Sequence, residues 1–169
     1  MQNNRRYAIL LAAMLAFSLL TGCEKAEEKV PETVATGSVV QTYTEKNMIT
    51  IYSINSDNMT LIPVSVKKGN QTTYTVADIC NLVIDNLEED DIILTSCRLK
   101  SNTAYISFSS KGKPIKNCSK KMEKLILEAI SNSVLDNIDS CENVVFRCDE
   151  KAYQSENRSF EKNEVYASE

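Results

Sequence analysis

Cysteine is the residue type with the most latent chemistry in this chain, which holds six cysteines in 169 residues. Thiols can form disulfides, bind metals or act as nucleophiles. Cys118 and Cys141 bracket a predicted helix of about 20 residues, which holds them about 30 Å apart, whereas a disulfide needs Cα atoms within about 7 Å. Cys141 and Cys148 flank one predicted strand and are poor partners too, up to ~23 Å apart.

The positions of the cysteines that follow Cys23 favour burial in the core over a disulfide or a metal site. Cys80 falls on the apolar face of a predicted helix, and Cys148 shares a strand face with Val144 and Phe146. We therefore expect these cysteines to act as small buried hydrophobic residues. One isolated disulfide and a metal site are the alternatives. A zinc site is the weaker of the two because the chain has no CxxC pair and no His. The sequence leaves open the redox state of Cys80, Cys97, Cys118, Cys141 and Cys148.

Other groups that could perform catalysis lack the spacing that catalysis needs. Histidine, the commonest general base, is absent. Ser119 is followed directly by Lys120, whereas a helical Ser-Lys dyad places the lysine three residues later. The acidic run 88–91 lacks the alternation and glycine of a calcium loop and favours a solvated helix end. The sequence therefore predicts no catalytic residue, no metal site and no cofactor.

Cys23 ends the segment Leu20-Thr21-Gly22-Cys23, which follows Arg5, Arg6 and a run from Tyr7 to Leu20 that is apolar apart from Ser18. This layout is typical of a secretory signal, and the run is too short to span a bilayer. Its last four residues resemble the bacterial lipoprotein processing site. The resemblance implies cleavage before Cys23 and lipid attachment to its sulfur, with acyl chains such as palmitate anchoring the protein to the extracytoplasmic face of the cell membrane. An ordinary cleaved signal and an unprocessed anchor are the alternatives.

Charge excludes a further class of partner. Residues 1–22 carry two of the 19 basic residues and none of the 23 acidic ones, so the processed chain has a net charge of −6. The isoelectric point is about 5.1, and no basic patch is longer than a lysine pair. Nucleic-acid binding, which needs such a patch, is therefore not expected.

Composition divides the chain into three parts. Residues 1–22 form the predicted lipoprotein signal peptide. Residues 23–47 are polar, lack periodicity and contain Pro31 and Gly37, which predicts a lipid-anchored flexible linker with an end-to-end distance near ~27 Å. Residues 48–169 contain the apolar periodic segments and are expected to fold as one domain.

Periodicity within residues 48–169 predicts five strands and two helices. The predicted strands are 48–54, 61–66, 92–99, 104–109 and 144–148, with Pro63 placing the second strand at a sheet edge. The first helix begins after Thr75, which forms a capping-box pattern with Asp78. The second begins after Ser119 and carries an apolar stripe that includes Ile130; Leu127 and Leu135 lie beside that stripe, and we expect them to be buried.

This order gives two strand-helix-strand crossovers around a hairpin. Right-handed crossovers place both helices on one face of a single mixed sheet. We therefore predict an α+β fold, a single two-layer domain with two helices packed on one face of a mixed β-sheet, preceded by a signal peptide and a disordered tether.

Residues 47 to 167 resemble the sporulation and spore germination domain GerMN. The resemblance rests on the order and spacing of several segments: Ile49-Thr-Ile-Tyr52, Leu61-Ile-Pro-Val64, Ala104-Tyr-Ile-Ser-Phe-Ser109, Leu125-Ile-Leu-Glu-Ala-Ile130 and Asn143-Val-Val-Phe146. It implies a split βαβ fold similar to ring-building modules. It further implies a non-enzymatic module of Gram-positive envelope lipoproteins.

Two function classes stay open. The first is a membrane-anchored interaction or assembly module whose partners are other envelope proteins or further copies of itself. The second is an extracytoplasmic module that binds a small ligand or a cell-wall glycan, so peptidoglycan is a further candidate partner. A glycan site typically offers aromatic platforms, and the chain has no Trp and seven scattered Tyr. The sequence therefore favours the assembly module.

Overall fold

A computed structural model describes residues 48–70 and 72–168 of the chain. The predicted signal peptide 1–22, the lipid attachment site Cys23 and the linker up to residue 47 lie outside the described residues. Within the described ranges, no helix has both the length and the apolar character needed to cross a membrane.

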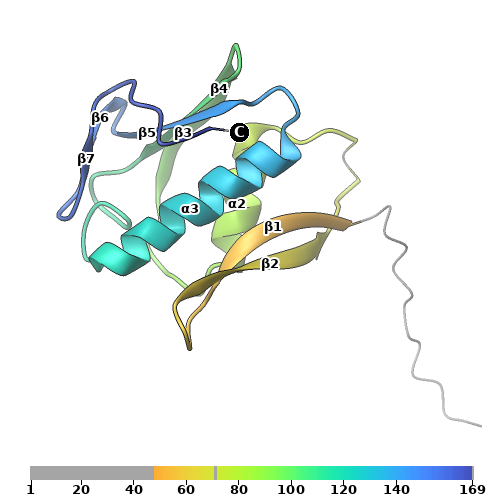
Figure 1. The fold of residues 1–169 in the computed structure, drawn as a ribbon, viewed down its shortest axis with the longest axis horizontal. Coiled ribbons are helices and arrows are strands. Elements are labelled where there is room, and N and C mark those ends of the chain that lie inside the picture. The colour runs from red at the N-terminus through yellow and green to blue at the C-terminus, as the bar shows by residue number, and fades with distance from the viewer. Residues whose placement is uncertain (1–47, 71, 169) are drawn as a thin grey trace, which may run out of the picture. The chain divides into compact units, whose positions relative to one another are not determined.

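The elements follow the predicted order as far as the strand after the second helix (Figure 1). The helices are α2 (Val76–Asn86) and α3 (Lys120–Asn137). The first five strands are β1 (Met48–Asn55), β2 (Thr60–Lys67), β3 (Leu94–Lys100), β4 (Thr103–Phe108) and β5 (Asn143–Cys148). Three short strands follow: β6 (Lys151–Gln154), β7 (Ser159–Phe160) and β8 (Ala167–Ser168). The α+β class predicted from the sequence is confirmed.

The sheet arrangement differs from the prediction in one respect, because the strands form two sheets rather than one. β1 and β2 form an antiparallel hairpin of their own, and the larger sheet has the order β3-β4-β5-β6-β7 with β8 also paired to β5. The crossover through α3 does join parallel neighbours, β4 and β5. The crossover through α2 does not, since β2 and β3 belong to different sheets.

Side chains of α3 explain why the hairpin stays separate. β1 uses one edge to pair with β2, and on its other edge the Tyr52 N–H donates to Ser133 Oγ at 2.8 Å while Thr50 O accepts from Asn137 Nδ2 at 2.8 Å. These backbone groups are therefore satisfied by a helix rather than by another strand. Pro63 lies opposite Tyr52 on β2, and among the described residues β2 pairs only with β1, so the predicted edge position of Pro63 is confirmed.

The helices begin where the local sequence predicts. Thr75 caps α2 in a reciprocal capping box with Asp78, and Ser119 caps α3 by accepting from Met122 N. Leu127 is fully buried as expected, whereas Leu135 is only half-buried and packs against the edge of the core. Because consecutive residues from Leu125 to Leu127 are buried, α3 is covered on more than one face. Figure 1 shows α3 between the β1–β2 hairpin and the larger sheet, and it contacts both.

The segment after β5 contains three short strands that the sequence analysis did not predict. Aromatic packing holds this segment in place. Five rings form a closed cycle with centroid separations from 5.0 to 6.3 Å: Phe108, Phe146, Tyr166, Phe160 and Tyr153. Burial and the adjacent Glu123 raise the pKa of Tyr153, whose hydroxyl donates to Glu123 Oε1 at 2.8 Å. The buried Glu123 also accepts from Ser155 Oγ at 2.6 Å, which ties the last segment to the first turn of α3.

Candidate functional site

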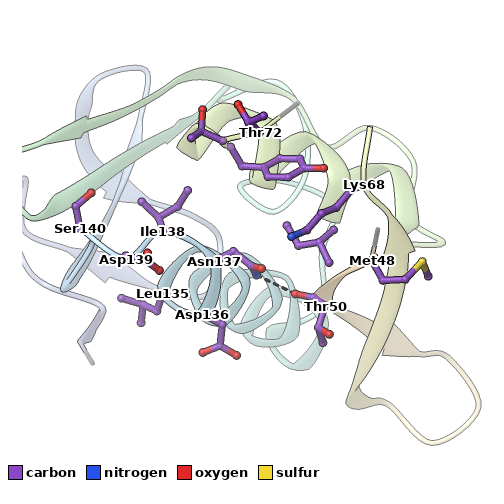
Figure 2. Close-up of a pocket in the computed structure, with 13 residues that line it drawn as sticks. Met48, Thr50, Lys68, Thr72, Leu135, Asp136, Asn137, Ile138, Asp139 and Ser140 are labelled. Carbon is purple, nitrogen blue, oxygen red and sulfur yellow. Dashed lines mark hydrogen bonds between the residues drawn. The ribbon is translucent and has the colours of Figure 1, made fainter. Parts of the chain in front are cut away.

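A polar cleft of about 970 Å³ opens where the start of β1 meets the end of α3 (Figure 2). Three segments line it: the first residues of β1, Lys68 with residues 72–74, and the last turn of α3 with the residues after it. The lining residues are Met48, Ile49, Thr50, Lys68, Thr72, Thr73, Tyr74, Leu135, Asp136, Asn137, Ile138, Asp139 and Ser140.

Hydrogen bonds between α3 and β1 fix one wall of the cleft. Asn137 Nδ2 donates at 2.8 Å both to Thr50 O on β1 and to Ser133 O on its own helix. Ser133 is fully buried; its hydroxyl accepts from Tyr52 N and donates to Ala129 O at 2.7 Å. Because the side chains of Ser133 and Asn137 each form hydrogen bonds to both β1 and α3, this wall of the cleft is pre-organised.

Asp136 stands at the exposed rim of the same wall. The hydroxyl of Tyr52 donates to Asp136 Oδ2 at 3.0 Å. This hydrogen bond and the negative charge of Asp136 raise the pKa of Tyr52, so the phenol stays protonated and continues to donate at neutral pH. The pair orients the carboxylate of Asp136 along the rim.

The electrostatic character of the cleft follows from the end of α3. The last carbonyls of a helix carry a partial negative charge, and the last turn of α3 holds no basic residue. Asp136 and Asp139 add two carboxylates, while Lys68 is the ammonium among the lining residues that the structure describes. Such a surface favours ligands with ammonium or hydroxyl donors and offers one cation to an acceptor.

The cysteines that the sequence singled out are distributed through the fold. Cys80 and Cys141 are buried, whereas Cys97, Cys118 and Cys148 are half-buried, and all five are thiols. Burial raises the pKa of Cys118 to about 11 and, together with Asp149, raises the pKa of Cys148, so both thiols are weak nucleophiles at neutral pH. Cys118 and Cys141 lie beyond opposite ends of α3, as predicted.

One cysteine contact was missed from the sequence. Cys80 on α2 and Cys97 on β3 pack against the same core where α2 contacts β3, and the two thiols are close enough for each to shift the pKa of the other. The sequence contains no signal for this contact, since it depends on the way α2 packs against β3.

The acidic run 88–91 does not converge on one point. Glu89 pairs with Lys113 at 2.5 Å, and Glu88 accepts from Ser56 Oγ at 2.9 Å in the β1–β2 turn. Among residues 48–70 and 72–168, no group of three or more His, Cys, Asp or Glu side chains is arranged to hold a metal ion. The ion pair with Glu89 raises the pKa of the Lys113 ammonium.

A charged cluster on the outer face of the larger sheet was also missed. Glu150 binds Arg98 at 2.6 Å and lies 3.7 Å from Arg147. Hydrogen bonds from Arg98 and Ser96 lower the pKa of Glu150 to about 2. The guanidinium of Arg147 stacks 4.4 Å from the centre of the Tyr105 ring. The cluster joins β3, β4, β5 and the turn before β6, residues too far apart in sequence for a motif to reveal.

The free edge of β3 is the other exposed feature of note. β3 pairs only with β4, so its second edge has no strand partner among the described residues. Two of the exposed large hydrophobic residues lie on or beside it, Leu99 at 38% exposure and Ile93 at 45%. An unpaired edge with apolar side chains is a common site of strand addition by another chain.

Solved structures similar to this chain include the two described below. No family model and no curated protein matches this chain. The tandem GerMN domains of the sporulation protein GerM from Bacillus subtilis match at 17% identity with a TM-score of 0.48, over 78% of this chain and 50% of that one. This chain is similar to GerMN domains. It spans half the length of the tandem GerM chain.

The second structure is a predicted lipoprotein from Clostridium perfringens. It matches at 16% identity with a TM-score of 0.41, over 79% of this chain and 95% of that one.

Proposed function

We propose that this protein is a lipid-anchored envelope lipoprotein whose GerMN-like domain is a non-enzymatic interaction module that assembles laterally, in sporulation or germination, with other envelope proteins or with copies of itself. The observation that carries the proposal is the open edge of β3. Strand addition along this edge would satisfy its free backbone N–H and C=O groups and cover Leu99 and Ile93 together.

Membrane anchoring allows the small contact area at the β3 edge to support association. Chains attached through Cys23 to one membrane share a thin layer, which raises their effective concentration far above that in solution. A short strand with two exposed apolar residues gives too little contact area for tight association in solution. The proposal therefore expects weak contacts between soluble copies and stable contacts between anchored ones.

Photocrosslinking in cells tests the edge directly. The photoreactive residue p-benzoylphenylalanine replaces Leu99 in the full-length anchored chain, and a matched chain carries it at Val165, which is 47% exposed but lies between β7 and β8. We expect light-dependent adducts, with another envelope protein or with a second copy, from position 99 and not from position 165. Equal yields at the two positions, or monomer alone at both, would contradict docking at β3.

The polar cleft favours a second candidate, the binding of a small ligand or a cell-wall glycan. Its carboxylates and hydroxyls suit a molecule that carries amino and hydroxyl groups, as peptidoglycan fragments do. In this case a purified muropeptide should bind the full-length chain in calorimetric titration, and Asp139→Asn should weaken binding by about tenfold, the effect of one charged hydrogen bond.

Asp57→Asn is the matched control for the cleft, because Asp57 is an exposed carboxylate in the β1–β2 turn, away from the lining residues. Tight muropeptide binding that Asp139→Asn weakens and Asp57→Asn leaves unchanged, combined with the absence of adducts at position 99, would favour the ligand-binding module over the assembly module.

A further inference from the structure

The packing of α2 against β3 brings two thiols together. Cys80 on α2 is fully buried in the core, and Cys97 on β3 is half-buried and packs against the same core. Cys97 lies opposite Ile106 in the register with β4, and Ile106 is itself fully buried. The side chain of Cys97 therefore points to the interior, toward α2.

Of the cysteines near Cys80, Cys97 is the one that an external reagent can reach. Cys141, which lies near Cys80 as well, is fully buried, and its thiol donates to Asn143 O at 3.3 Å. Cys97 is partly exposed and belongs to the outermost strand of its sheet. Attack on an external oxidant can therefore begin at Cys97 and be completed by Cys80.

We infer that Cys80 and Cys97 form a reversible disulfide that ties α2 to β3, directly behind the open edge of the larger sheet. The inference goes beyond the proposed function and shares with it only the extracytoplasmic location, where disulfides persist. Such a bridge closes a loop of about 18 residues that contains the acidic run 88–91. It holds β3 in place whether or not a partner occupies its edge.

The reaction is a thiol–disulfide exchange with an external disulfide, either a small molecule or the disulfide of an oxidoreductase. Cys97 loses its proton, and its thiolate attacks one sulfur of the oxidant, which breaks the oxidant's S–S bond and releases one thiol. Cys80 then loses its proton and attacks the Cys97 sulfur, releasing the second thiol. Two protein thiols are thus oxidised by two electrons, and one external disulfide is reduced to two thiols.

The mutual influence of the two thiols assigns these roles. It lowers the pKa of Cys97 and raises the pKa of Cys80, whose burial acts in the same direction. Cys97 is therefore the readier thiolate and attacks first. Cys80, held protonated until the mixed disulfide forms, acts as the resolving thiol.

Oxidation of the purified full-length chain with oxidised glutathione tests the inference. Peptide mapping after alkylation under non-reducing conditions should show one cross-linked peptide pair, containing Cys80 and Cys97, that dithiothreitol releases. Because the bridge closes about 18 residues, the melting temperature should rise on oxidation on the order of 10 °C.

Cys97 and Cys148 are both half-buried strand cysteines and provide the matched variants. Cys97→Ser should abolish the cross-linked peptide and the rise in melting temperature, whereas Cys148→Ser on β5 should retain both. A bridge between other cysteines, such as Cys80 with Cys141, would overturn the inference. So would a folded wild-type chain in which Cys97 stays free to alkylation after oxidation. These results are independent of crosslinking at position 99, so either proposal can fail alone.

Discussion

Replacing Ser133 with alanine should destabilise the contact between α3 and β1, whereas replacing Ser131, two residues earlier on the same helix, should not. Both serines are buried, and both substitutions raise helix propensity by about 0.5 kcal/mol. They differ in their partners. Ser133 Oγ accepts from the Tyr52 N–H of β1, while Ser131 Oγ donates only within α3, to Glu128 O at 3.3 Å.

The magnitude follows from the group that is left without a partner. Ser133→Ala leaves the Tyr52 N–H unpaired beneath the helix, which costs about 1–3 kcal/mol, while Ser131→Ala removes a long bond within one helical turn and costs close to nothing. The propensity gain is common to both variants and cancels. The free energies of unfolding should therefore differ by about 1–3 kcal/mol, which corresponds to about 4–12 °C in melting temperature.

Urea unfolding followed by far-UV circular dichroism measures this difference, and hydrogen exchange at the Tyr52 amide locates it. We expect faster exchange at that amide in Ser133→Ala alone. If the two variants unfold within about 0.5 kcal/mol of each other and the amide exchanges at the parental rate in both, the hydrogen bond does not hold the hairpin and the two-sheet arrangement loses its explanation.

Three further substitutions test the core, the charged cluster and the anchor. Ile130→Asp places a carboxylate at a fully buried position of α3 and should cost several kcal/mol, enough to prevent folding; parental thermal melting would refute the packing of this helix. Glu150 has a pKa of about 2, below its usual value, so its ion pairs stabilise the fold above about pH 4.5 and lose that effect as pH falls toward 2. Because the Arg98 and Glu150 side chains are 48% and 43% exposed, Glu150→Gln should cost at most about 1 kcal/mol at pH 7, and its difference from wild type should shrink on acid titration; a constant difference would argue against the ion pair. Cys23→Ser should leave the chain unprocessed or release it from the membrane, and unchanged mass with unchanged detergent partitioning would exclude lipid attachment at this residue.

Local signals were sufficient for the elements whose ends are set by neighbouring residues. Thr75 with Asp78 and Ser119 with Met122 N satisfy free N–H groups within one turn, so the sequence contains everything needed to place both helix starts. The β3–β4 hairpin is equally local, since its turn at Ser101 joins strands that are adjacent in the chain. The parallel pairing of β4 with β5 follows from the crossover rule.

The features that sequence reasoning missed depend on contacts between distant residues. Nothing near β1 indicates that Ser133 and Asn137, more than 80 residues later, occupy its free edge, and polar residues on a helix are ordinarily assigned to solvent. The cleft formed by β1 and the end of α3 could not be predicted for the same reason. β6, β7 and β8 are too short for periodicity, and rings from several elements hold them in place.

The position of β1 at the start of the described chain has a mechanical consequence. Any pulling force transmitted from the preceding residues enters the fold at Met48, which pairs with Lys67 at the open end of the β1–β2 ladder. Force applied there opens an antiparallel hairpin one residue pair at a time, rather than shearing all of its hydrogen bonds together. The β1–β2 layer should therefore yield first under tension from the N-terminal side, while β3, β4 and β5 stay folded around α2 and α3.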